Sequence, residues 1–172
     1  ELCDDTATGD MQEVFDLTQN EAYIINNEAD VSATYHESIE DAEAGANAIA
    51  DPTQYTNTSE EQPIFVRVTN DNTGCYTIVS FVIRVYPLPA VTAVEDYIVC
   101  EVGTDGFWAF DLTTKTAEVL NGQDPLIYAV TYHETQLDAE SGINALVNPY
   151  TNIVNPQQIY VNITNTLTGC DI

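Results

Sequence analysis

The sequence QPIFVRVTNDNTGC at residues 62–75 returns as QQIYVNITNTLTGC at residues 157–170. Eight of the 14 positions are identical, and Phe/Tyr and Val/Ile exchanges account for two more. FDLT at residues 15–18 and TYHE at residues 34–37 also recur, 95 and 97 residues further on. Repetition at one nearly constant offset indicates that the chain is two tandem copies of a single module.

Both copies alternate apolar and polar residues, as half-buried β-strands do. Ile64, Val66 and Val68 lie on one strand face, and residues 159–163 repeat that pattern. Further strands are predicted at residues 13–17, 23–26, 31–36, 76–86, 108–112 and 128–133. Short strands at this spacing predict an all-β protein made of two tandem Ig-like antiparallel β-sandwich modules.

Two prolines in PLPAVTAVE, residues 87–95, mark the boundary between modules, which we place at 1–90 and 91–172. The apolar strand expected at residues 76–86 has no counterpart after Cys170. The plain explanation is that the sequence is part of a longer array, and both termini are expected to be cut ends. The alternative is that a neighbouring chain supplies the closing strand of the second module.

One segment in each copy is expected to be a short helix rather than a strand. Ser38 stands three residues before Asp41, and Thr135 stands three residues before Asp138, each ahead of alanine-containing sequence. A hydroxyl followed by a carboxylate at this spacing is a variant of the capping box. The pattern predicts a helix start after Ser38 and after Thr135.

Each copy has one cysteine near its beginning and one near its end, Cys3 and Cys75, then Cys100 and Cys170. Four cysteines allow three connectivities, and the repeat favours Cys3–Cys75 and Cys100–Cys170, so that each module closes itself. Disulfides imply an oxidising, extracellular location. Four reduced thiols are the alternative, and zinc is disfavoured because no CxxC pair is present.

The charge is strongly negative, with 28 acidic residues against three basic ones and a net charge of −25. Nucleic acid and anionic membranes would be repelled, so we exclude both as partners. No stretch has the length and apolar purity of a signal peptide or transmembrane helix, so direct membrane insertion is not expected.

An acidic loop follows the first cysteine and is the candidate metal site. Asp4, Asp5 and Asp10 are hard oxygen ligands of the kind that calcium prefers. The second copy offers only Glu101 and Asp105, so a second calcium site would be weaker. A solvated acidic loop without a metal is the alternative.

Catalysis is not expected, and no catalytic residue is assigned. His36 and His133 each precede a glutamate, but their equivalent places at strand ends favour a structural hydrogen bond over a general base. Trp108, with Phe107 and Phe110, is expected to pack in the core, and a sugar-stacking platform is the alternative. Asn57 and Asn162 lie in N-x-S/T sequons, which suit an exposed secreted surface.

Several motifs together resemble the long tandem repeats of Bacteroidetes giant surface adhesins. They are CDD, FDLT, TYHES followed by DAEAG and NAI, PTQYTNT, IFVRVTN, TGC and FVIRVYPLP. The resemblance implies a gliding-motility-type protein that is exported by type IX secretion. It also implies that Thr6, within Asp5-Thr-Ala7, is a candidate O-glycosylation site.

These features together predict a structural and adhesive repeat in a cell-surface stalk or filament involved in attachment or gliding. Its expected partners are neighbouring repeats of the same protein, with surface glycans or other proteins as further candidates. The alternative is a carbohydrate- or protein-binding module of a secreted surface protein. Apart from calcium, no cofactor is expected.

Overall fold

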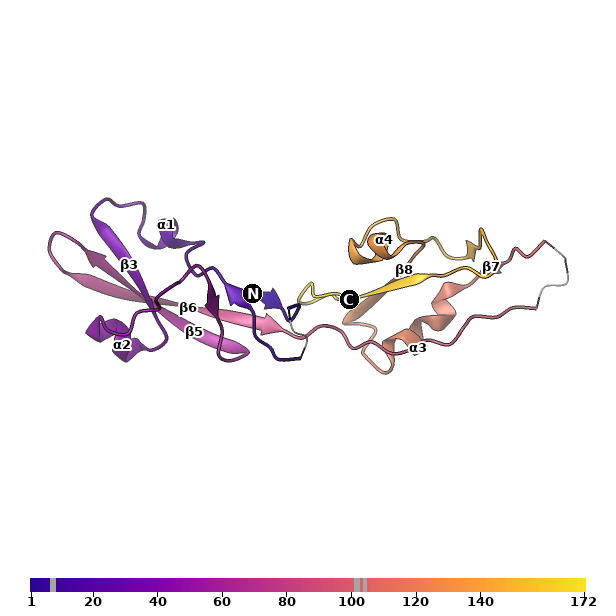
Figure 1. Cartoon of the computed structure of the whole chain (residues 1–172), viewed down its shortest axis with the longest axis horizontal. Helices are drawn as coiled ribbons and strands as arrows, with labels where there is room; N and C mark the ends of the chain where they lie inside the picture. The colour runs from indigo at the N-terminus through magenta and orange to yellow at the C-terminus, as the bar shows by residue number, and fades with distance from the viewer. Residues whose placement is uncertain (7–8, 101–102, 104) are drawn as a thin grey trace. The chain divides into compact units, whose positions relative to one another are not determined.

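The computed structural model describes residues 1–6, 9–100, 103 and 105–172 (Figure 1). The chain divides into two compact units, Glu1–Pro87 and Leu88–Ile172, which are described separately. The regular structure of the chain is mostly β, which confirms the predicted fold class. Among the helices in the described ranges, none is long and apolar enough to cross a membrane.

The first unit is built on a four-stranded sheet in the order β1 (Leu2–Cys3), β6 (Tyr76–Tyr86), β5 (Glu61–Asn70), β3 (Val31–His36). β6 runs antiparallel to β5 and parallel to β1, so the sheet is mixed rather than purely antiparallel. A two-stranded sheet pairs β2 (Val14–Phe15) with β4 (Tyr55–Thr56). Figure 1 shows β5 and β6 as one long hairpin.

The core of the first unit forms where apolar side chains from both sheets meet. Its buried members are Phe15, Leu17, Tyr35, Tyr55, Ile64, Val66, Ile83 and Val85. β6 contributes the last two, and neither is more than 5% exposed. Because burying such a side chain stabilises a fold by about 1.5–3 kcal/mol, β6 is a major source of stability here.

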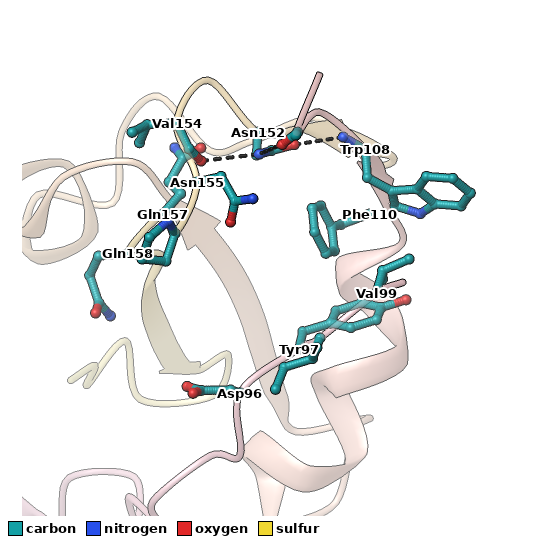
Figure 2. Close-up of a pocket in the computed structure, with 13 residues that line it drawn as sticks. Asp96, Tyr97, Val99, Trp108, Phe110, Asn152, Val154, Asn155, Gln157 and Gln158 are labelled. Carbon is teal, nitrogen blue, oxygen red and sulfur yellow. Dashed lines mark hydrogen bonds between the residues drawn. The ribbon is translucent and has the colours of Figure 1, made fainter. Parts of the chain in front are cut away.

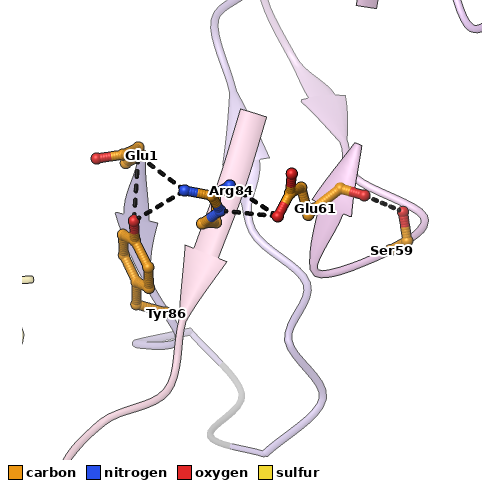
Figure 3. Close-up of polar contacts among 5 residues, drawn as sticks. All are labelled: Glu1, Ser59, Glu61, Arg84 and Tyr86. Atoms are coloured by element: carbon orange, nitrogen blue, oxygen red, sulfur yellow. Dashed lines mark hydrogen bonds and ion pairs between the residues drawn. The ribbon is translucent and has the colours of Figure 1, made fainter. Parts of the chain in front are cut away.

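Arg84 fastens β6 to both of its neighbours on the outer face of the sheet (Figure 3). Its guanidinium lies 2.7 Å from a Glu61 carboxylate oxygen on β5 and 3.5 Å from Glu1 beside β1. It also donates to the Tyr86 hydroxyl at 3.2 Å. The ion pairs are partly exposed, so their main role is to fix strand position rather than to add much stability.

The second unit has two two-stranded sheets. β8 (Tyr128–His133) pairs with β10 (Tyr160–Asn165), and β7 (Ala109–Phe110) pairs with β9 (Tyr150–Thr151). Its core lies against helix α3 (Thr116–Leu120), which follows the 3₁₀ helix η1 (Leu112–Lys115), and contains Val119, Leu120 and Ile163. No strand in the described part of this unit corresponds to β1 or β6.

The two predicted capped helices are present. α2 (Ile39–Ala44) begins after Ser38, whose hydroxyl accepts the Asp41 N–H at 3.1 Å. α4 (Gln136–Glu140) begins after Thr135, whose hydroxyl accepts the Asp138 N–H at 3.1 Å. These caps satisfy one of the free N–H groups that every helix start exposes.

The strand predicted at residues 23–26 is wrong, because this segment belongs to helix α1 (Glu21–Ile24) and the turn after it. Asn26 and Asn27 adopt φ angles of 55° and 52°, which no β-strand allows but which asparagine tolerates better than most residues. Tyr23 is 87% exposed, so its aromatic ring is not evidence of a buried strand.

Candidate functional site

The state of the four cysteines differs from the predicted pairing. Cys3 and Cys170 are disulfide-bonded, whereas Cys75 and Cys100 are exposed free thiols. The predicted bonds Cys3–Cys75 and Cys100–Cys170 are therefore wrong, and with them the idea that each module is closed by its own disulfide. Each copy carries one bonded and one free cysteine.

Strand β6 explains why Cys3 cannot reach Cys75. Cys3 is aligned with Tyr86 at one end of β6, and Cys75 immediately precedes Tyr76 at the other end. A strand of 11 residues holds these ends roughly 33 Å apart, whereas a disulfide needs Cα atoms within about 7 Å. The first and last cysteines of one copy therefore lie at opposite ends of the same strand.

Cys75 and Cys170 occupy the same kind of turn in their respective copies. The Asn70 N–H donates to the Cys75 carbonyl at 2.9 Å, and the Asn165 N–H donates to the Cys170 carbonyl at 2.8 Å. Gly74 and Gly169 precede them with φ angles of 72° and 80°, a region that glycine enters without strain. The turn thus has the same form whether its cysteine is bonded or free.

In the acidic loop of the first copy, Asp4 stabilises the backbone of the loop. The Asp4 side chain is 1% exposed, and its carboxylate accepts the N–H groups of Gly9 and Met11. Asp5 is exposed, and Asp10 accepts the Gln12 N–H at 2.9 Å. Asp4 therefore has a structural role that its sequence pattern does not reveal.

The remaining predicted calcium ligands are in the second copy. Asp105 is exposed and accepts the Phe107 N–H at 3.1 Å, and Glu101 lies outside the described residues. Within the described ranges, no three His, Cys, Asp or Glu side chains are grouped so that they could hold a metal ion. Calcium at either loop stays a prediction.

Thr6, the candidate glycosylation site, holds a carboxylate. Its N–H and its hydroxyl donate to the two oxygens of Glu13 at 2.7 and 2.5 Å. The hydroxyl donates the stronger of these contacts, and together they lower the pKa of Glu13 below its usual value of 4.5. Thr6 modification stays a prediction, and it would require this hydroxyl to leave Glu13.

This contact predicts an acid-sensitive step in stability. A carboxyl whose pKa is lower in the folded state stabilises the fold above about pH 4.5, and that contribution is lost as the pH falls through the folded pKa. Thr6→Val removes the hydroxyl donor, so we expect the stability of the first unit to fall less steeply with acid. Urea denaturation from about pH 6 to about pH 3 measures this, and parallel curves for both proteins would contradict it.

His36 and His133 have the structural role that was predicted for them. Both are 0% exposed. The Nδ1 atom of His36 donates to the Ala46 carbonyl at 2.9 Å, and Nδ1 of His133 donates to the Ile143 carbonyl at 2.8 Å. Each Nε2 bonds the threonine hydroxyl two residues earlier, Thr34 or Thr131. Each ring therefore ties the loop after a helix to a strand.

The sequon asparagines are not exposed, contrary to expectation. Asn57 and Asn162 are 1% and 2% exposed. The Asn57 side chain accepts from the Glu13 N–H at 2.7 Å and donates to the carbonyls of Met11 and Ser59. Asn162 donates to the Ala139 carbonyl and to Asp171. Both side chains therefore make hydrogen bonds inside the fold.

The second unit contains a pocket of about 530 Å³ (Figure 2). Its lining includes residues 96–99 and 154–158, together with Trp108 and Phe110. Tyr97 meets Phe110 edge-to-face, with ring centroids 5.1 Å apart. Trp108 is 45% exposed and Phe107 48% exposed, so the expectation that they pack in the core is wrong.

The sequence was also compared with known proteins. A family model described as the Flavobacterium inter-domain disulphide bond domain matches residues 1–89 and, a second time, residues 96–172. The chain belongs to this family. No curated protein and no solved structure matches it.

Two matches to one inter-domain disulphide bond domain agree with the internal repeat and with a tandem-domain protein of Bacteroidetes type. The family description names a disulfide between domains, whereas sequence reasoning placed one within each domain. The pairing could not have been corrected from the predicted strand at residues 76–86 alone, because it depends on Cys3 aligning with Tyr86, at the end of that strand away from Cys75.

Proposed function

We propose that this chain is a structural and adhesive repeat of an extracellular surface adhesin, and that it forms part of a stalk or filament used in attachment or gliding. The observation that carries the proposal is the cysteine pattern. The bonded Cys3 belongs to the first copy and the bonded Cys170 to the second, while each copy keeps one free thiol. We therefore infer that one disulfide joins the two copies.

A bond of this kind suits a load-bearing array. It holds two neighbouring modules together even when the non-covalent contacts between them are weak. The net charge of −25 would keep neighbouring stalks apart in solution. Export by type IX secretion, a surface location, a role without catalysis and calcium in the acidic loops belong to the same proposal and rest on the resemblance and composition.

Tryptic mapping under non-reducing conditions tests the disulfide. The chain has only three cleavage sites, after Arg67, Arg84 and Lys115, and these place the four cysteines in four different peptides. We expect peptide 1–67 to be linked to peptide 116–172, and peptides 68–84 and 85–115 to carry alkylated thiols. The proposal would be overturned if each copy contained its own disulfide. In that case peptide 1–67 would be linked to peptide 68–84, and peptide 85–115 to peptide 116–172.

The second candidate is a carbohydrate- or protein-binding module, favoured by the exposed Trp108 beside the pocket of the second unit. Indole rings stack on sugar faces, so a glycan screen with the Trp108→Ala variant as control tests this role. Selective binding that the variant loses would favour the binding module over a purely structural repeat.

A further inference from the structure

The pocket of the second unit lies where β6 lies in the first. By the repeat, Ile98 and Val99 correspond to Glu1 and Leu2, which flank β6 on its parallel side. Residues 156–158 correspond to residues 61–63, which flank β6 on its antiparallel side. Both walls of the pocket therefore include the counterparts of backbone segments that flank β6.

The backbone along the pocket confirms this correspondence. Residues 61–64 of β5 pair with β6 alone, since β3 pairs only with residues 65–70. Their counterparts, residues 156–159, belong to no strand, and β10 begins at Tyr160. Residues 96–100, which include the counterpart of β1, are likewise in no strand. The segments that lose strand structure are those that depend on β6.

The core of the second unit is open on the same side. Ile64 and Val66 are fully buried and Phe15 is 7% exposed, whereas the counterparts Ile159, Val161 and Phe110 are all partly exposed. Leu112 and Tyr132 stay buried, as do their counterparts in the first unit. What is missing is the layer that Ile83 and Val85 supply.

The register for such a strand is already set by Asp171 and Ile172. Asp171 forms a β-bridge with Thr164, as Tyr76 pairs with Thr69 in the first copy. Ile172 and Ile163 exchange two backbone hydrogen bonds, at 3.0 and 3.1 Å. A strand laid in line with these two residues runs antiparallel to β10 and enters the pocket.

We propose that this pocket is the binding site for an extended β-strand that runs antiparallel to β10 in line with Asp171 and Ile172, with apolar side chains at alternate positions. Backbone hydrogen bonds to residues 156–159 and to residues 98–99 hold it on both sides. Its inward side chains cover Ile159, Val161 and Phe110. This is strand addition to a sheet, with specificity supplied by pockets for alternate side chains.

The residues beside one position of the strand differ between the pocket and the site of β6. This difference determines which side chain the bound strand should carry at that position. In the first unit, Arg84 is held by Glu1 and Glu61, and the residues at these two positions in the second copy are Ile98 and Pro156. An arginine at this position of the bound strand would have neither carboxylate. The second unit therefore prefers a neutral residue there.

Tryptophan fluorescence can measure binding to the pocket, because Trp108 is the only tryptophan in the sequence and lines the pocket. A synthetic peptide with the sequence of residues 78–88 is titrated into the full chain under oxidising conditions. We expect a saturable blue shift of the tryptophan emission as the strand displaces water. A peptide with the Arg84→Thr change should bind more tightly, and one with Ile83→Asp and Val85→Asp at least about tenfold more weakly.

A matched pair of chain variants locates the site. Val99→Asp places a charge on the pocket wall and should weaken binding, whereas Val91→Asp, at an exposed position outside the pocket lining, should not. For a poorly soluble peptide, the same 11 residues are appended after Ile172, and the blue shift should then occur without added peptide. The proposal would be overturned if Val99→Asp and Val91→Asp weakened binding equally. It would also be overturned if neither the free peptide nor the appended strand shifted the tryptophan emission.

Discussion

Replacing Asn57 by aspartate is expected to destabilise the first unit by about 3–5 kcal/mol. The Asn57 amide nitrogen donates to the carbonyls of Met11 and Ser59 at 2.8 and 2.9 Å, inside the fold. Aspartate would turn a carboxylate oxygen towards these two acceptors, and no cationic side chain bonds this group. The change keeps size and shape but leaves a buried charge opposed by two carbonyl oxygens.

Hydrogen exchange measured by mass spectrometry resolves the two units and can assign the loss to the first. Asn72→Asp is the matched control, since Asn72 is exposed and makes no side-chain contact of this kind. Asn152→Asp should repeat the effect in the second unit, where Asn152 bonds Trp108, Gly106 and Val154 in the same way. A loss below about 1 kcal/mol for Asn57→Asp would contradict the expected role of the amide.

Replacing His36 by leucine is expected to cost the first unit about 2–4 kcal/mol. Leucine fills similar space, but it leaves the Ala46 carbonyl and the Thr34 hydroxyl without the bonds that the ring supplies. The loop after α2 would lose its tie to β3. Urea denaturation followed by hydrogen exchange in the first unit measures the loss.

Thr34→Val separates the two ring contacts. It removes only the hydroxyl bonded to Nε2 and should cost about 1 kcal/mol, so most of the His36→Leu effect should come from the bond to Ala46. His133→Leu should shift stability in the same direction in the second unit, because its contacts to Ile143 and Thr131 are equivalent. A neutral or stabilising His36→Leu would contradict a structural role for this ring.

Local sequence signals predicted most elements of this fold. The strands at residues 31–36, 76–86 and 128–133 have the predicted bounds. Residues 31–36 and 128–133 each end in a buried pair of residues, whereas residues 76–86 are a long apolar run whose buried members are Ile83 and Val85. The helix starts after Ser38 and Thr135 also followed, since a capping bond involves residues only three positions apart. Residues 23–26 were predicted to form a strand because their side chains favour β-structure, but they belong to a helix and the turn after it.

The candidate sites were harder to predict because they depend on which distant segments meet. Nothing local in Cys3 shows that β1 aligns with Tyr86, the end of β6 away from Cys75. Burial of Asn57 depends on β2, β4 and the loop after Met11 coming together. Phe110 is more exposed than its counterpart Phe15, which packs with Ile83 and Val85 of β6, and no strand in the described part of the second unit corresponds to β6.

The parallel pairing of β1 with β6 has a mechanical consequence for the first unit. Both strands point the same way, so tension applied at Glu1 and at Pro87 pulls them in opposite directions along their length. The bonds between them, including the one from the Asp4 N–H to the Tyr86 carbonyl, are then loaded together in shear rather than broken one at a time as in a zipper. Unfolding by stretching should therefore require a higher force than peeling β6 from β5.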